Sequence, residues 1–140
     1  MLSSPGCWAA YGEVLAREYG SPEHFQVHRL TVDAYAVQHP GIDTPVSRQS
    51  VGLHLLGLHA CLELELTGAS ALQLIRRAVK QIEFPWLASG RDRAQGTVAD
   101  VQGAAADASS HSAAVKRWAG AAWAQYASHH NQVRVWVRSL

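Results

Sequence analysis

The stretch from Val46 to Leu66 constrains the fold most, because it is apolar on nearly every side when it is drawn as a helix. At 100° per residue its large apolar side chains point in almost all directions. They are Val51, Leu53, Leu55, Leu56, Leu58, Leu62 and Leu64. A helix that is apolar all round must be covered by neighbours on most sides. We therefore expect this helix to lie at the centre of an all-α domain.

Helix start and stop signals divide the rest of the chain. A serine before a proline favours a helix start, because its oxygen accepts from a free amide and proline suits the first helical position. Glycine, or a following proline, favours a helix end. These signals predict helices over residues 5–19, 22–39, 46–66, 71–83, 97–106, 109–126 and 129–138. The Gly-, Ser- and Arg-rich residues 87–96 are predicted to form a loop.

A chain of 140 residues is long enough to bury one core. The sequence therefore predicts a compact single-domain bundle of six or seven helices over residues 1–140, with the third helix central. Apolar residues at helical spacing predict the buried faces. In the first helix Trp8, Tyr11 and Leu15 share one side. In the fourth helix the row predicted to face inward is Leu72, Ile75, Val79 and Ile82.

Composition and charge argue against a nucleic-acid partner. The chain is 48% hydrophobic and 16% charged with a net charge of +1, which is typical of a globular protein. Basic residues gather at Arg76, Arg77 and Lys80, but Glu83 interrupts them and no aromatic residues are interleaved, so nucleic acid is not an expected partner.

Targeting signals and thiol motifs are missing from the sequence. No apolar run reaches the length of a membrane span, and the first residues lack the pattern of a signal peptide. The two cysteines are too few for a disulfide framework and do not form a zinc motif. We expect a cytoplasmic protein without a membrane partner.

Residues 25–40 carry two histidines on one predicted face. A spacing of three and four residues places five side chains on the same side of the helix. They are Phe25, His28, Val32, Tyr35 and His39. We expect this face to point into the core or into a crevice. Arg29 and Asp33 fall on the opposite side, four residues apart, which predicts an exposed ion pair.

Histidine is the residue type from which a site is most easily built here, because the chain has eight. Metal sites in helical bundles combine inward-facing side chains from several helices. His28 and His39 lie roughly 16 Å apart along a helix axis, so they cannot hold the same ion. We expect His39 at its helix end to meet His54, with His129 or His130 completing a site for a divalent transition metal such as zinc, iron or nickel. The alternative is that these histidines are structural and bond to backbone or tyrosine.

A pocket beside this site is predicted to be lined by His28, Tyr35, Cys61, Trp123 and Tyr126. The alternative is that the aromatic side chains only fill the core, and that Cys61 is a small buried residue. No Ser-His-Asp order, phosphate-binding glycine loop or dinucleotide motif is present. No reaction is assigned, and whether the chain is an enzyme stays open.

Five motifs resemble those of a bacterial family known only as a domain of unknown function. They are SPGCW at 4–8, VHRLTVDAYAVQHPG at 27–41, QSVGLHLLGL at 49–58, TVADV at 97–101 and the closing W…HH…VRVW. The resemblance implies an all-helical domain and no particular reaction. Its histidines correspond to His28, His39, His54 and the pair at 129 and 130, whereas His111 does not match. Family members often carry an upstream Cys-x-x-Cys segment that is missing here, so no zinc ribbon is expected.

Two functional interpretations follow. The first is an uncharacterised bacterial protein with a histidine-rich metal or small-ligand site between the second, third and last helices. If such a site is catalytic, we expect a metal-activated water to act on a small substrate. The second is a non-enzymatic helical module that binds a partner protein and whose histidines are structural.

Overall fold

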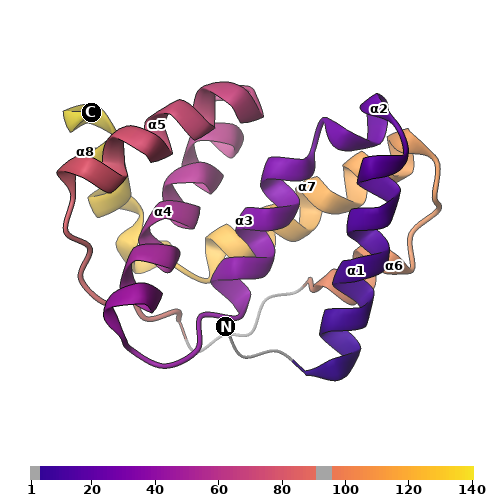
Figure 1. Ribbon diagram of the computed structural model, residues 1–140, viewed down its shortest axis with the longest axis horizontal. Helices are drawn as coiled ribbons and strands as arrows, with labels where there is room; N and C mark the ends of the chain where they lie inside the picture. Colours follow the sequence, from indigo (N-terminus) through magenta and orange to yellow (C-terminus); the bar gives the residue numbers. More distant parts are fainter. Residues whose placement is uncertain (1–3, 91–95) are drawn as a thin grey trace.

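The computed structural model describes residues 4–90 and 96–140. These residues contain eight α-helices, one 3-10 helix and no strand (Figure 1). The helices are α1 (Pro5–Gly20), α2 (Pro22–Phe25), α3 (His28–Gln38), α4 (Pro45–Leu62), α5 (Gly68–Gln81), α6 (Val98–Gln102), α7 (Ala108–Ala124), η1 (Ala127–His129) and α8 (His130–Ser139). The predicted all-α fold is confirmed. Part of the loop predicted over 87–96 lies outside the described residues.

Helix α3 lies in the middle of the molecule, between α1 and α2 on one side and α4, α5 and α8 on the other (Figure 1). Helix α7 runs behind it and contacts both α3 and α4. Helix α4 also contacts α5 and α8, so neighbours cover it on several sides, and Leu55, Leu56 and Leu58 are fully buried. Much of α4 is covered as predicted, but α3 and not α4 lies in the middle of the molecule, and Leu64, beyond the end of α4, is 47% exposed. No helix in the described part of the chain has both the length and the apolar character needed to cross a membrane.

Side-chain caps explain most of the helix starts. Ser21 accepts from the backbone N–H of His24, Thr44 from that of Ser47, and each is followed by a proline in the first turn. Thr97 and Asp100 form the two halves of a capping box at α6. Short polar side chains satisfy amide groups that the first helical turn leaves without acceptors. These local signals explain why the helix starts could be read from the sequence.

The helix predicted over residues 22–39 is in fact two helices, because the backbone leaves helical geometry at Val27, with φ −99° and ψ 7°. The face predicted to point into the core or a crevice is divided as a result: Tyr35 lies in the core, and Phe25, His28 and Val32 line a groove. Phe25 is 44% exposed, and only Tyr35 of that row is fully buried. Helix α3 is covered on several sides, so Leu30 and Ala34, outside that row, are buried as well.

The predicted face of the first helix is wrong at Trp8, although Tyr11 is partly buried against the core. Trp8 is 62% exposed, and the row that packs inward is Ala10, Val14 and Glu18. These three residues follow one another at intervals of four, as a helical row does. The row ends in a carboxylate, which is why a search for apolar spacing passed over it.

Gly52 of α4 makes a tight contact with Phe84, in the segment that follows α5. A Cβ atom at this position would overlap the buried ring of Phe84. Gly120 of α7 has no neighbouring atom within 4 Å of where its Cβ would be. The two glycines are therefore a matched pair for measuring the contact.

We expect Gly120→Ala to stabilise the protein by about 0.4–1 kcal/mol, because alanine restricts the unfolded chain and fits the helix. Gly52→Ala has the same propensity gain but forces Phe84 to move, so we expect a net loss of about 1–3 kcal/mol. The free energy of unfolding from urea titrations measures both changes. Equal values for the two variants would contradict the tight contact.

The end of α4 is tied to α8 by charge. Glu63 accepts hydrogen bonds from Arg134 Nη2 at 2.8 Å and Arg134 Nε at 3.0 Å, and pairs with His59 Nδ1 at 2.7 Å. The bonds from Arg134, followed by that with His59, lower the pKa of Glu63 from 4.5 to about 2. The folded protein therefore holds this proton less tightly than the unfolded chain does.

A carboxylate with a lowered pKa stabilises the fold above its unfolded pKa, and this contribution is lost as the pH falls from about 4.5 towards 2. We expect Glu63→Gln to lower the free energy of unfolding by up to about 1 kcal/mol at pH 6. The difference from the parent protein should shrink at pH 3. Glu65→Gln, two residues away, is the control, and the same pH dependence in both variants would contradict the assignment.

Candidate functional site

A fully buried carboxylate on α1 joins three helices. Glu18 Oε1 lies 2.9 Å from His28 Nδ1, and Glu18 Oε2 lies 2.8 Å from His111 Nε2 and accepts from Thr31 Oγ1 at 2.5 Å. His28 and Thr31 belong to α3, and His111 belongs to α7. A buried carboxylate needs such partners, because removing it from water is otherwise very costly. Glu18 therefore fixes how α1, α3 and α7 sit against one another.

His111 leaves one polar atom unmatched in this cluster. Its Nδ1 is buried and has no hydrogen-bond partner among the residues that the structure describes. The ring of His24 lies nearby, with a centroid separation of 5.5 Å, but its nitrogens bond to Ser21 and to the carbonyl of Ala106.

A second fully buried carboxylate joins α3 to α4. Asp33 accepts from Arg29 Nε at 3.0 Å and from Arg29 Nη2 at 2.5 Å, and its Oδ1 lies 2.7 Å from His54 Nδ1. A Cβ atom at Gly57 of α4 would overlap the Asp33 carboxyl group, so the glycine makes room for it. The ion pair between Arg29 and Asp33 exists as predicted, but the prediction that it is exposed is wrong. Helix α4 covers Asp33 completely.

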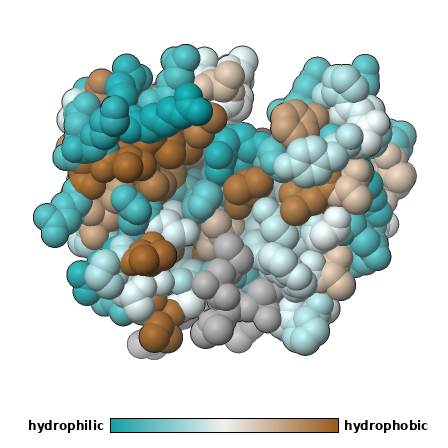
Figure 2. Space-filling model, in the orientation of Figure 1, coloured by the Kyte–Doolittle hydropathy of each residue, from teal (hydrophilic) through white to brown (hydrophobic). Residues whose placement is uncertain are grey.

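Beside these pairs a groove of about 880 Å³ lies between α3 and the start of α5. Figure 2 shows the surface hollowed between α5 and α2. The lining residues, named here as the α3–α5 groove, are Phe25, Gln26, His28, Arg29, Val32, Thr67, Gly68, Ala69 and Leu72. Most of the wall is apolar, and the polar groups include His28 and Arg29.

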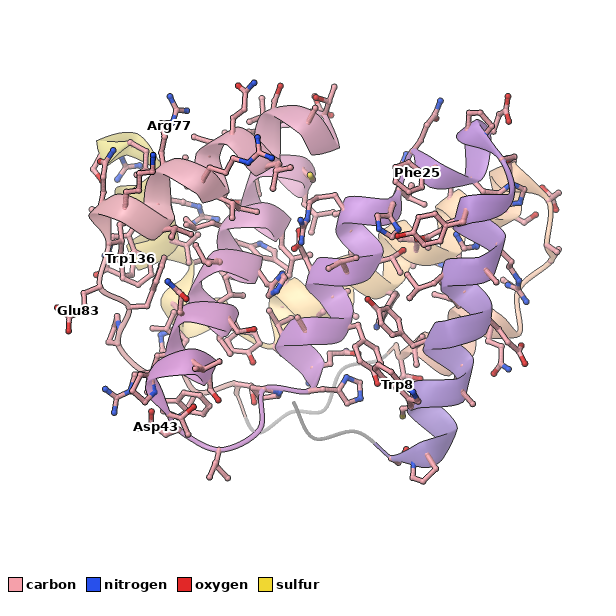
Figure 3. All side chains as sticks on the ribbon, in the orientation of Figure 1. Trp8, Phe25, Asp43, Arg77, Glu83 and Trp136 are labelled. Carbon is pink, nitrogen blue, oxygen red and sulfur yellow. The ribbon has the colours of Figure 1, made fainter. Side chains whose placement is uncertain are left out.

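The imidazole of His28 is held on three sides. Its ring stacks on Phe25 with centroids 4.5 Å apart, Tyr19 lies 5.2 Å away, and Nδ1 pairs with Glu18. Nε2, on the other side of the ring, has no hydrogen-bond partner within the described residues. Phe25 lies at the opposite end of α3 from Trp8, as the labelled side chains in Figure 3 show. A carboxylate behind an accessible imidazole is an arrangement suited to proton transfer.

The same end of the groove favours negative charge. The guanidinium of Arg29 is oriented by Asp33 through Nε and Nη2, and Nη1 makes no hydrogen bond to the described part of the chain. The first turn of α5 begins at Gly68, where a Cβ atom would lie 3.3 Å from the Cβ of Arg29. The first amides of a helix lack helical acceptors, and the helix dipole there attracts anions.

A neighbouring pocket of about 420 Å³ shares Gln26, Arg29, Thr67 and Gly68 with the groove. Its wall also includes Cys61. Burial, followed by the nearby Asp33 charge, raises the pKa of the Cys61 thiol to about 11. This thiol is therefore protonated at neutral pH and unsuited to act as a nucleophile.

The two histidines expected to meet at a metal ion have other partners. His39 Nδ1 bonds to the carbonyl of Tyr35 at 2.9 Å, and its ring stacks on that of Tyr35. His54 pairs with Asp33. The Nδ1 atom of each imidazole is therefore already bonded within the fold.

The two histidines expected to complete the metal site are likewise bonded to backbone. His129 Nε2 lies 2.8 Å from the carbonyl of Ala88, and His130 Nε2 lies 2.8 Å from that of Trp123. Within residues 4–90 and 96–140, no three or more His, Cys, Asp or Glu side chains are grouped so as to hold a metal ion. The metal site stays a prediction that this arrangement does not support.

The predicted pocket residues fall into two groups. His28 lines the α3–α5 groove and Cys61 lines the neighbouring pocket. Tyr35, Trp123 and Tyr126 are buried in the hydrophobic core. Burial raises the pKa of Tyr126 to about 12, and its hydroxyl donates to a backbone carbonyl of α3.

Sequence reasoning missed Glu18, Thr31 and His111. Glu18 carries a weak signal, since it continues the helical row of Ala10 and Val14. The contact between His111 and Glu18 joins residues 93 positions apart, which no local pattern reveals.

We expect Glu18→Gln to destabilise the fold by about 3 kcal/mol, because the amide cannot accept from all three partners and the charge is lost. Glu13→Gln, on an exposed position of the same helix, is the control and should change stability little. Thermal and urea unfolding measure the difference. Indistinguishable stabilities of the two variants would show that the cluster does not hold the three helices together.

Comparisons with known proteins name no activity. Searches of curated proteins and of solved structures give no significant match. Residues 1–127 match one family profile, which covers most of the chain. The chain belongs to this family, which is described as a family of unknown function (DUF5946).

Proposed function

We propose that this protein binds a small molecule with an anionic group and an apolar body in the α3–α5 groove, and that His28 exchanges a proton with it. One observation carries the proposal. His28 and Arg29 are adjacent in sequence, lie at the wall of one mostly apolar groove, and are each held from behind by a fully buried carboxylate.

The buried carboxylates favour a functional explanation because they are a poor way to stabilise a core. Well-packed apolar residues of similar volume are often as stabilising as a buried ion pair. What Glu18 and Asp33 provide is orientation, since each fixes one side chain at the groove. Binding sites work best when their polar groups are held in place before the ligand arrives.

The character of the groove indicates the class of ligand. Its volume of about 880 Å³ falls in the range of small-molecule sites, which are mostly apolar with a few polar groups. Arg29 and the first turn of α5 favour an anion, and Lys116 adds a positive charge in the neighbouring pocket, where Glu65 opposes it. Phe25, Val32 and Leu72 line the wall that would accept the apolar part.

If the site is catalytic, general acid–base chemistry at His28 fits it better than nucleophilic attack. The Cys61 thiol is held protonated by its raised pKa. A histidine backed by a carboxylate can take up or release a proton within hydrogen-bond reach of a ligand.

Other expectations stay predictions. They are the single domain over 1–140, the cytoplasmic location, the absence of nucleic-acid partners, and a divalent metal on His39, His54, His129 and His130. The metal would require imidazoles that are not grouped in the described structure to converge on one ion, and metal analysis of the untagged protein tests it independently of the groove.

The ligand proposal can be tested with sodium octanoate and phenyl phosphate as anionic probes and octanamide as the uncharged counterpart of octanoate. We expect at least one anion to raise the melting temperature and to shift the imidazole NMR signals of His28. Octanamide should bind at least tenfold more weakly than octanoate if octanoate is the better probe. The expected tenfold ratio corresponds to about 1.4 kcal/mol.

Two variants and one control locate the binding. His28→Gln keeps a donor for Glu18 but removes the imidazole, and Leu72→Glu places a negative charge in the groove. Both should weaken anion binding at least tenfold, whereas His129→Ala, which removes an imidazole bonded to Ala88, should not. Failure of both anions to bind, or equal effects in all three variants, would refute the proposal.

A further inference from the structure

Helix α5 has a second apolar row that the core does not cover. The row that packs against the rest of the fold is Ala71, Leu74 and Ala78. Of the four residues predicted to point inward, Ile82 packs against the core, whereas Leu72, Ile75 and Val79 are only partly covered, and Val79 is 47% exposed. Figure 2 shows a hydrophobic band along α5, just below its hydrophilic outer edge. The inward prediction is therefore wrong for the three residues of this row that lie on α5.

Positive charge borders this row on one side. At 100° per residue, Arg76 lies about 40° and Lys80 about 80° around the helix from Leu72. Both are exposed, and neither forms an ion pair with a residue that the structure describes. Arg77, further round, points away from the body of the molecule (Figure 3). Glu83, just beyond the end of α5, is the nearest acidic residue in sequence.

We propose that the α5 surface, made of Leu72, Ile75 and Val79 with Arg76 and Lys80 at its edge, binds an acidic amphipathic helix of a partner protein. Leucine-type residues at helical spacing on the partner would cover the apolar row. Acidic residues beside them would meet the two cations. This is the helix-in-groove mode of recognition, in which the apolar stripe gives affinity and the flanking charges fix the orientation.

The shape of the surface favours a helix over a flat membrane. The band runs along α5 and reaches the hollow between α5 and α2 at one end (Figure 2), where Leu72 lines the groove. A flat bilayer would meet the projecting edges first and would leave Leu72 uncovered.

Charge disfavours a second copy of this chain as the occupant. The other strongly amphipathic helix is α8, whose sequence HNQVRVWVRS contains no acidic residue; its Arg134 is paired with Glu63, and Arg138 adds a further positive charge. Docking α8 of one copy onto α5 of another would bring like charges together. A partner with acidic residues beside its apolar stripe has the opposite and favourable arrangement.

This inference does not depend on the small-molecule proposal. The α5 surface and the α3–α5 groove share Leu72, whereas Arg76, Ile75, Val79 and Lys80 lie outside the residues that line the groove. Variants at these positions therefore separate the two activities.

The test uses a fluorescent helical peptide of about 18 residues, roughly five turns, with leucine on one stripe and glutamate beside it. A matched peptide carries lysine in place of glutamate. With the full chain, we expect the glutamate peptide to bind at least tenfold more tightly in fluorescence anisotropy. The double variant Arg76→Glu/Lys80→Glu should reverse this preference, and Val79→Asp should weaken both peptides.

Arg117→Glu, which reverses an exposed charge on α7, is the control and should leave the preference unchanged. The octanoate response of each variant shows whether the groove is intact, so loss of peptide binding alone isolates the α5 surface. No binding of the glutamate peptide, or equal binding of both peptides, would overturn the proposal. Self-association of the protein that Val79→Asp abolishes would also overturn it. A further contrary result would be binding to anionic phosphatidylglycerol vesicles, but not to the peptide, that the double charge reversal abolishes.

Discussion

Two carboxylates, Glu18 and Asp33, are buried inside an apolar bundle, and the rest of the structure depends on the partners that each of them needs. Glu18 joins α1 to α3 and α7, and Asp33 joins α3 to α4. Rotating or sliding any of these helices would leave a charge buried without a partner, which costs far more than a small change in apolar contact. Helix α3 is therefore fixed from both sides. The same contacts hold the side chains of His28 and Arg29, at the start of α3, in position.

Local chemistry could be predicted from the sequence, and most of the packing could not. The starts at Ser21 and Thr97 follow from hydrogen bonds within one turn, so the sequence contains everything needed to find them. The buried face of α1 was mistaken because its row includes Glu18, and the rule that charged residues face water fails where partners arrive from elsewhere. The break between α2 and α3 at Val27 could not be predicted either, because no proline or glycine stands there.

The candidate site shows the same division. His28 was recognised as a residue on a crevice, but its partner Glu18 comes from another helix, and that contact exists only after folding. The expected metal ligands come from separate parts of the fold, and no three potential ligands are grouped among the described residues. His39 and His130 each bond one ring nitrogen to a backbone carbonyl, an arrangement that metal-binding histidines share, so this bond does not decide whether a metal binds. Only the distances between the side chains bear on a metal site, and these depend on the packing of whole helices.

Gly57 has a consequence for how this family can vary. The carboxyl group of Asp33 fills the space that a side chain at position 57 would need. The size of the residue at either position therefore limits the size of the residue at the other. Any larger residue at position 57 needs a shorter one at position 33, and such a change would also release Arg29 and His54 from their shared partner. Positions 33 and 57 should therefore be inherited as a pair, and relatives that lose the glycine should have lost the charge beneath it.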